Sequence, residues 1–169
     1  MLLEFYYKLR HPGEPVPYYY KRSILEEIWH LMRKGICQNI APNCVTNFMR
    51  VRLYRLCGIK IGKGTFIGMK CYLDDLCHDK IEIGKRVTIS YGVYFACHGA
   101  KQGHNKIVIH DGAYIGMRAS IIAPTDIEIG AKAIVGAQTL VNRSIPAEKT
   151  AVGIPCRIIE KSVIDADTN

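Results

Sequence analysis

The sequence contains no run of about 20 apolar residues, which is the length needed to cross a lipid bilayer. Its longest stretches without charge, such as residues 36–49, are interrupted by glutamine, asparagine and proline. The first ten residues include Glu4, Lys8 and Arg10 and leave no room for the apolar core of a secretory signal. We therefore expect a cytoplasmic protein. With 169 residues, 49% hydrophobic and 22% charged, it should form one compact domain with at most a small appendage.

Closely spaced cysteine pairs are also missing, and acidic residues are scarce. The seven cysteines are odd in number and include no C-x-x-C pair, which favours reduced structural thiols over a disulfide frame or a zinc ribbon. The net charge is +8; residues 1–58 hold nine Lys/Arg against four acids, and residues 59–169 hold fourteen against eleven. A basic balance favours an anionic partner. Because no nucleic-acid recognition motif is present, we expect a phosphorylated small molecule.

A six-residue repeat organises the chain from residue 61 onward. Each unit begins with a large apolar residue, the fifth position is small in almost every unit, and the second position is glycine in six of twelve units. Extra residues at 79–82, 101–108 and 127–128 all fall between complete sets of three units. The twelve first positions are Ile61, Ile67, Leu73, Ile83, Ile89, Phe95, Ile109, Ile115, Ile121, Ile129, Val135 and Val141.

A period of six fits neither an α-helix nor a simple alternating strand. It fits a triangular parallel β-coil, in which three short strands make one coil of eighteen residues and the first-position side chains stack along the axis. We expect the repeated glycines to lie at corners, because glycine tolerates a positive φ. Such a solenoid needs a cap at each end. A β-sandwich or a series of buried strands does not account for twelve units in register.

Two helices are expected before the repeat. Ser23 and Glu26 form a capping box for a helix over residues 24–34 that ends at Gly35. A second helix is expected over residues 45–57. Its expected role is to cover the open end of the first coil, and the alternative is a basic helix that docks on a membrane surface or a partner. Three arginines lie on its polar side: Arg50, Arg52 and Arg55.

The stretch from Phe5 to Tyr20 contains two aromatic clusters and three prolines, and we expect it to be extended. It could pack on a neighbouring subunit or line an acceptor site, and the sequence does not decide between these roles.

The hexapeptide pattern resembles the left-handed parallel β-helix of the hexapeptide-repeat acyltransferases, over about residues 58–161. The resemblance implies an all-β core of about four to five coils with an N-terminal helical cap. It divides the chain into an N-terminal extension with capping helices (1–58), a β-helix domain (59–161) and a tail (162–169).

His98, in the unit FACHGA, matches the catalytic histidine of the maltose and galactoside O-acetyltransferases of this family, although Gly99 follows it where those enzymes usually have proline. Transfer of an acetyl group from a thioester to a hydroxyl needs a base, and histidine suits this role. His104 and His110 are interpreted as loop and surface residues. Cys97 is not expected to be a nucleophile, because direct transfer needs no covalent enzyme intermediate.

The stretch VNRSIPAEKTAVGIPCRII resembles the coenzyme A-binding end of these sugar acetyltransferases. The resemblance implies that Ala137 contacts the pantetheine arm through its backbone and that Arg157 faces a phosphate. Met117 stands near the thioester where the family often has serine, so an oxyanion contact there must come from backbone N–H groups. The predicted coenzyme-binding residues are Met117, Ala137, Arg143, Lys149, Arg157 and Lys161. The alternative is a set of solvated charges at the end of a solenoid.

On the acceptor side, Asp75 lines up with an aspartate that faces the acceptor in maltose-type enzymes. The asparagine that those enzymes carry seven residues earlier is replaced by Gly68. We therefore expect an acceptor that is neither maltose nor a galactoside. Acetyltransferases of capsule and lipopolysaccharide synthesis resemble the chain at least as well, which implies a hydroxyl on a sugar or glycan precursor.

The leading interpretation is a homotrimeric acetyl-CoA-dependent O-acetyltransferase with its active site between subunits and no metal. Peripheral membrane contact through the basic N-terminal region is a further expectation. Three alternatives remain open: an N-acetyltransferase acting on nucleotide-linked amino sugars, a γ-carbonic-anhydrase-like zinc enzyme using His98, His104 and His110, and a scaffold without catalysis.

Overall fold

The computed structural model describes residues 2–16, 23–98 and 104–159. The chain divides into two compact units, residues 1–35 and residues 36–169. Each unit is described by itself below. No helix among the described residues is long and apolar enough to span a membrane.

The first unit begins with helix α1 (Leu2–Arg10), which corrects the expectation of an extended chain from Phe5. The prolines that suggested extended structure all follow the helix, beginning at Pro12. Within α1, the Lys8 ammonium pairs with the Glu4 carboxylate one turn earlier at 2.8 Å, a spacing that supports a helix. The remaining part of the expected segment, residues 17–20, lies outside the described residues.

Helix α2 (Ile24–Gly35) begins with the predicted capping box. The Glu26 N–H donates to Oγ of Ser23 at 3.2 Å, and the Ser23 N–H donates to Oε2 of Glu26 at 2.8 Å. The helix is amphipathic, yet no described residue of it is buried. Its apolar side chains are therefore exposed within their unit.

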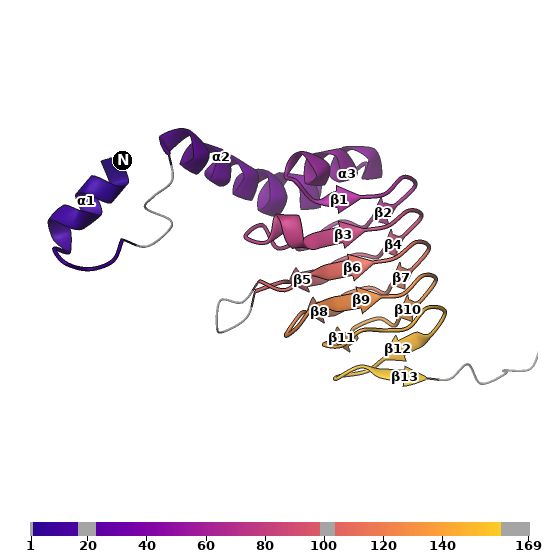
Figure 1. Cartoon of the computed structure of the whole chain (residues 1–169). Helices are drawn as coiled ribbons and strands as arrows, with labels where there is room; N and C mark the ends of the chain where they lie inside the picture. Colours follow the sequence, from indigo (N-terminus) through magenta and orange to yellow (C-terminus); the bar gives the residue numbers. More distant parts are fainter. Residues whose placement is uncertain (1, 17–22, 99–103, 160–169) are drawn as a thin grey trace, which may run out of the picture. The chain divides into compact units, whose positions relative to one another are not determined.

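The second unit begins with a helical cap made of η2 (Ile36–Ile40), η3 (Ala41–Asn43) and α3 (Asn47–Leu56). Helix α3 lies across the first coil of the solenoid (Figure 1). Two of its buried side chains bind backbone carbonyls of that coil. Arg50 Nε donates to Ile67 O at 2.7 Å, and the Tyr54 hydroxyl donates to Cys71 O at 3.1 Å. The cap is thus joined to the coil by hydrogen bonds as well as by apolar contact.

Short strands form three sheets that are the faces of a β-solenoid of about four turns (Figure 1). The first sheet has the order β1 (Lys60–Ile61), β3 (Ile81–Ile83), β6 (Ile107–Ile109), β9 (Ile127–Ile129). The second has the order β2 (Phe66–Ile67), β4 (Thr88–Ile89), β7 (Tyr114–Ile115), β10 (Ile134–Val135), β12 (Thr150–Val152), β13 (Arg157–Ile159). The third comprises β5 (Tyr94–Ala96), β8 (Ser120–Ile122) and β11 (Leu140–Val141).

Parallel pairing in register confirms the predicted ladders. Ile83 lies beside Ile61 and Ile109, and Ile115 lies beside Ile89 and Val135. All first-position residues are buried except Ile61, which is partly buried under the cap. All seven cysteines are free thiols, and six of them are buried in the hydrophobic core. Strand β13 pairs antiparallel to β12 and closes the last coil.

The reason expected for the second-position glycines is wrong. Positive φ occurs instead at the fourth position, where Lys70 (φ 59°) and Gln138 (φ 57°) adopt it without being glycine. The second-position glycines are required by close approach between coils. A Cβ on Gly62 would lie 2.4 Å from the carbonyl carbon of Gly84, and one on Gly130 would lie 2.3 Å from the nitrogen of Ala147. Glycine therefore sets the spacing of the coils rather than the turn of the chain.

Candidate functional site

His98 follows β5 at the corner that leads toward β6. Its Nδ1 lies 2.5 Å from Oδ2 of Asp74, which is fully buried, while the imidazole remains 39% exposed. The Asp74 carboxylate is itself held by the backbone, because Leu76 N–H donates to Oδ1 at 3.1 Å and Cys97 N–H donates to Oδ2 at 2.9 Å. A fixed carboxylate thus orients a solvent-accessible histidine.

This pair sets which imidazole nitrogen can act as a base. Both oxygens of Asp74 accept backbone hydrogen bonds, so the proton in the bond to His98 lies on Nδ1. The lone pair of Nε2 is then free to receive a proton, as in other carboxylate–histidine pairs. The sequence analysis missed Asp74. The signal that could have found it is an acidic residue at the second position of LDDLCH, where half the units carry glycine.

Two backbone contacts hold the corner that carries His98. An antiparallel bridge joins His98 to His104, and Asn105 N–H donates to Cys97 O at 2.8 Å. The Asn105 side chain also donates to Ala123 O at 2.8 Å in the next coil. His98 therefore stands at the base of a closed loop, although residues 99–103 of that loop are not described.

Asp75 points to a different partner from Asp74. It is 3% exposed, and its Oδ1 accepts from Nε2 of Gln38 at 2.7 Å. Its Oδ2 is buried and has no hydrogen-bond partner among the described residues. A buried carboxylate oxygen without a donor is costly, so a bound group that donates a hydrogen bond to it would be favoured.

A metal site is the other chemistry to consider at this corner. Among the described residues, one group of three potential ligands lies close together: Asp74, Cys77 and His98, with ligand atoms within 4.8 Å. Burial and the neighbouring Asp74 raise the pKa of the Cys77 thiol to about 11, so without a metal it is a neutral thiol. Asp74 and His98 are already bonded to each other. The donor set therefore fits a carboxylate–histidine pair better than a metal centre.

The three histidines of the zinc alternative do not lie close enough together to bind one ion. His110 is exposed, and its Nε2 lies 3.1 Å from Oε2 of Glu128. His104 is exposed at the base of the loop. The γ-carbonic-anhydrase arrangement, which needs three histidines around one ion, is thus not formed by His98, His104 and His110.

Cys97 is fully buried in the coil. Burial, and then the charge of Asp74, raise the pKa of its thiol well above the ordinary range. A thiol in this state is a poor nucleophile. The environment of Cys97 therefore favours a structural role.

Two of the predicted coenzyme residues occupy one corner of the solenoid. Met117 lies between β7 and β8, and Ala137 lies between β10 and β11, one coil further along. The corners stack directly, since Gln138 N–H donates to Met117 O at 2.8 Å. Ala137 is exposed, and no backbone acceptor for its N–H lies among the described residues. It can therefore donate to a ligand.

The predicted phosphate-binding cations lie on the last coil. Arg143, Lys149 and Arg157 are all exposed, and no acidic side chain pairs with them among the described residues. Arg157 begins β13, the strand that closes the coil. Lys161 lies outside the described residues. The geometry leaves three cations available to an anionic ligand.

One chain does not bring His98 and the Met117–Ala137 corner together. The corner at Met117 precedes β8, whereas the corner at His98 follows β5, and β5 pairs with β8 in the same sheet. The width of one face therefore separates the two groups of residues. A site containing both needs a second chain.

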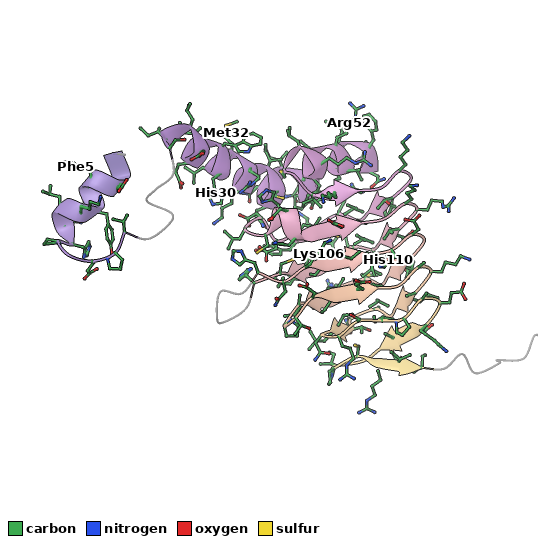
Figure 2. The ribbon with its side chains drawn as sticks, viewed as in Figure 1. Phe5, His30, Met32, Arg52, Lys106 and His110 are labelled. Atoms are coloured by element: carbon green, nitrogen blue, oxygen red, sulfur yellow. The ribbon has the colours of Figure 1, made fainter. Side chains whose placement is uncertain are left out.

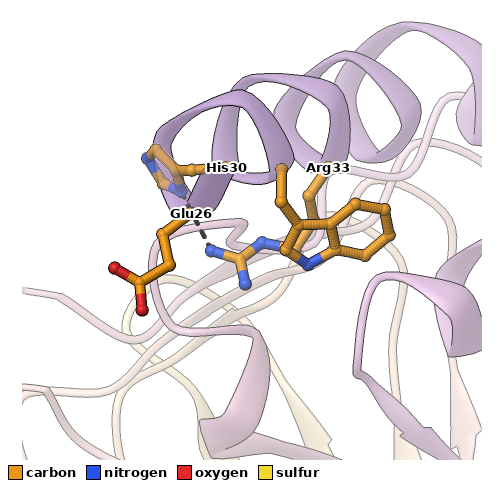
Figure 3. A pocket seen from close by; sticks show the side chains of 4 residues that line it. Glu26, His30 and Arg33 are labelled. Atoms are coloured by element: carbon orange, nitrogen blue, oxygen red, sulfur yellow. Dashed lines mark hydrogen bonds between the residues drawn. The ribbon is translucent and has the colours of Figure 1, made fainter. Parts of the chain in front are cut away.

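A hollow on α2 offers a second histidine for comparison (Figure 3). It is lined by Glu26, Trp29, His30 and Arg33, all on one helix. Nη2 of Arg33 lies 2.9 Å from Nδ1 of His30. Because an arginine can only donate, Nδ1 accepts and the neutral ring carries its proton on Nε2. His30 thus has the tautomer opposite to that of His98, and its outer nitrogen cannot accept a proton.

Comparisons with known proteins find relatives that match part of the chain. No protein-family model matches the chain. The bifunctional protein GlmU of Rubrobacter xylanophilus is 35% identical over 108 residues, which are 60% of this chain and 22% of GlmU. A serine acetyltransferase of Bacillus licheniformis is 35% identical over 104 residues, 60% of this chain and 45% of that enzyme. The chain thus spans less than half the length of the curated relatives it matches.

Solved structures resemble most of the chain. A hexapeptide-repeat acetyltransferase of Vibrio cholerae superposes with a TM-score of 0.64 at 23% identity, covering 82% of this chain and 93% of that one. The same enzyme complexed with acetyl coenzyme A gives 0.62 at 21% identity, covering 93% and 97%. A maltose O-acetyltransferase of Clostridium difficile gives 0.59 at 24% identity, covering 82% and 89%. The resemblance expected from the repeat is confirmed: the chain has the left-handed β-helix fold of the hexapeptide-repeat acetyltransferases.

Proposed function

We propose that the protein is an acetyl-CoA-dependent O-acetyltransferase that moves an acetyl group to a hydroxyl of a sugar or glycan precursor. The observation that carries this proposal is the 2.5 Å contact between His98 Nδ1 and buried Asp74, which leaves Nε2 as an accessible base. Support also comes from the fold, which is shared with a structure complexed with acetyl coenzyme A.

In the proposed reaction, Nε2 of His98 takes the proton of the acceptor hydroxyl as its oxygen attacks the thioester carbonyl. The carbon–sulfur bond then breaks, and the coenzyme A sulfur leaves and receives the proton from His98. The imidazolium that exists between these events is stabilised by Asp74 through Nδ1. Met117 has no side-chain donor for the oxyanion, so backbone N–H groups serve there.

Coenzyme binding is assigned to the last two coils. We assign the exposed Ala137 N–H as a donor to the pantetheine arm. The exposed cations Arg143, Lys149 and Arg157 suit its phosphate groups, because an arginine fork can donate two hydrogen bonds to one phosphate. Lys161 is proposed as a further partner on the sequence resemblance alone.

The separation of His98 from the Met117–Ala137 corner supports a site shared between copies, and we propose a homotrimer. The outer face of the third sheet offers a surface for it, because the His98 corner and the Met117 corner lie at its two edges. Tyr94 and Ile122 are exposed on that face. Closed threefold symmetry buries such flat faces and brings one chain's His98 beside its neighbour's coenzyme corner.

The acceptor is proposed to bind at Asp75, whose buried Oδ2 lacks a donor among the described residues. The same observation favours a second candidate, an acceptor that carries an ammonium group beside its hydroxyl. Such a group both donates hydrogen bonds and neutralises the carboxylate. Serine is an acceptor of this kind, and it fits the names of several curated relatives. An amino sugar acetylated on nitrogen is the third member of this set.

The test begins with calorimetric titration of the purified protein with acetyl-CoA in the presence of a chelator. Release of the coenzyme thiol is then followed with panels of neutral sugars, amino sugars and L-serine. Micromolar binding with thiol release on a hydroxyl acceptor supports the proposal. Absence of acetyl-CoA binding contradicts it and favours the scaffold alternative.

The base is tested with a matched pair of variants. His98→Ala should lower turnover by about 10²-fold or more and leave the fold intact. His110→Ala removes another histidine that contacts a carboxylate, on Glu128, and should keep full turnover. Equal activity of both variants would remove His98 from the role of base.

A further inference from the structure

The outward face of α3 carries large apolar side chains where a capping helix normally presents polar ones. The helix buries Arg50, Val51 and Tyr54 against the first coil. On the opposite side, Phe48, Arg52 and Leu56 follow one another at four-residue intervals, and Phe48 and Leu56 are 62% and 57% exposed. Val45 and Met49, which flank this row, are exposed as well. We call these five residues, together with Arg55 and Lys63, the cap face.

The cap face contains cations that no acidic group neutralises among the described residues. A hollow beside it is lined by Asn47, Phe48, Val51, Arg52, Arg55, Lys63 and Gly64, with no acidic residue among them. The guanidinium carbon of Arg52 lies 4.3 Å from the centre of the Phe48 ring. This stacking leaves the guanidinium N–H groups available around its edge. Figure 2 shows Arg52 pointing away from the coils.

The sequence around this face is depleted in acid. No aspartate or glutamate occurs from residue 28 to residue 73, while the same stretch contains eight lysines and arginines. In the second unit, Arg50 is buried on backbone carbonyls and Lys60 is paired with Glu82 at 2.8 Å. The positive charge that remains in the hollow comes from Arg52, Arg55 and Lys63.

Hydrogen bonds fix the cap face relative to the solenoid. The Asn47 side chain donates to Thr65 O at 3.1 Å and accepts from Ile67 N–H at 2.9 Å, which joins the start of α3 to the first coil. Arg55 donates from Nε and Nη2 to Ile61 O at 3.0 and 2.8 Å, so its guanidinium is held in place. An anion that binds here meets one cation, Arg55, already in position, which reduces the entropy lost on binding.

We propose that the cap face docks the protein on an anionic phospholipid surface. Arg52, Arg55 and Lys63 contact lipid phosphates, while Phe48, Leu56 and Met49 enter the boundary between headgroups and acyl chains. Exposed apolar side chains interleaved with unpaired cations are the combination that binds such an interface. This proposal goes beyond acetyl transfer and is independent of it, because the cap face shares no residue with the proposed reaction site.

A second copy of the chain is a less suitable occupant. Two cap faces brought together would oppose their arginines and lysines without an acidic group in either hollow, and like charges at an interface are unfavourable. A phospholipid surface supplies the opposite charge and an apolar layer together. Charge complementarity therefore favours the membrane.

The test is flotation of the full-length protein with vesicles of phosphatidylcholine alone and of phosphatidylcholine mixed with phosphatidylglycerol. We expect binding to the mixed vesicles only, and its loss near ~1 M salt, where charges are screened within about 3 Å. The double variant Arg52→Gln/Lys63→Gln should lower partitioning by about tenfold or more. Phe48→Ser should weaken binding to the same vesicles.

The matched control is Arg118→Gln/Lys132→Gln, which removes the same charge from corners of later coils and should bind like the unchanged protein. Thermal midpoints of all variants check the fold. The proposal is overturned by equal binding to neutral vesicles, by no binding to anionic ones, or by equal loss in the control. It is also overturned if the cap-face variant changes only the sedimentation behaviour of the free protein, since the face would then join copies of the chain.

Discussion

The solenoid and helix α2 differ in the burial of their apolar side chains, although both have a regular pattern of apolar residues in the sequence. In the coils, Ile115 is fully buried between Ile89 and Val135 on the neighbouring turns. In α2, Ile28 and Leu25 belong to an equally clear apolar stripe but are 49% and 79% exposed. A repeating coil provides its own covering surface in the next turn, whereas a single helix must find a partner for its apolar face.

The two regions also differ in how they hold a histidine. His98 is oriented by a buried carboxylate that is itself fixed by two backbone N–H groups. His30 has an arginine from its own helix at Nδ1. The same side chain is thus prepared as a base in the solenoid and not in α2. Burial of the orienting group, rather than the presence of histidine, distinguishes the two places.

The largest effect that separates these regions is expected from Asp74→Asn. An asparagine amide can donate to Nδ1 of His98 and so favour the tautomer with its proton on Nε2, which lowers turnover by about 10²–10⁴-fold. His30→Gln, the matching change in α2, should leave turnover unchanged. Steady-state rates with acetyl-CoA measure both. Full activity of Asp74→Asn would show that the carboxylate does not prepare the base.

The second largest difference between the two regions is expected in how an Ile→Ala substitution changes the free energy of unfolding. Ile115→Ala removes a buried side chain from the middle of a ladder and should lower the free energy of unfolding by about 2–5 kcal/mol. Ile28→Ala removes an exposed one and should change it by about 0.5 kcal/mol or less. Urea unfolding of both variants gives the comparison. A large loss in Ile28→Ala would mean that α2 has a covering partner.

A smaller difference is expected in coenzyme affinity. Arg157→Ala should raise the dissociation constant of acetyl-CoA by about tenfold and leave the thermal midpoint unchanged, because it removes a charge-assisted hydrogen bond at an exposed site. Lys34→Ala removes one positive charge from α2 and should leave the dissociation constant as it was. Calorimetric titration measures both. Equal affinities would mean that Arg157 is only a solvated charge.

The coil could be predicted from the sequence because its signal repeats. Every first position must be large and apolar to fill the axis, and Ile83 and Ile109 fulfil this in adjacent turns. The prediction that the second-position glycines adopt a positive φ is wrong. Gly62 is needed because the next coil lies where its Cβ would be, and that distance depends on how the coils stack.

Helix α1 and the role of Asp74 could not be predicted from the sequence. The prolines that begin at Pro12 led to the prediction of an extended segment, although a helix precedes them. Asp74 and Asp75 are neighbours in LDDLCH, and alignment with related enzymes favoured Asp75. The two neighbouring carboxylates have different partners, because Asp74 reaches His98 and Asp75 reaches Gln38. Only the register of successive coils decides which of the two carboxylates contacts His98 and which contacts Gln38.

The measurement that tests the central claim most directly is the tautomer of His98, observed by ¹⁵N NMR of the imidazole at a pH where the ring is neutral. His98→Ala identifies the resonances, and Asp74→Asn shows what the carboxylate contributes. The account predicts a proton on Nδ1 and an unprotonated Nε2 in the unchanged protein, with this preference lost in Asp74→Asn. A proton on Nε2 in the unchanged protein would contradict it, because His98 would then have no free lone pair for the acceptor hydroxyl.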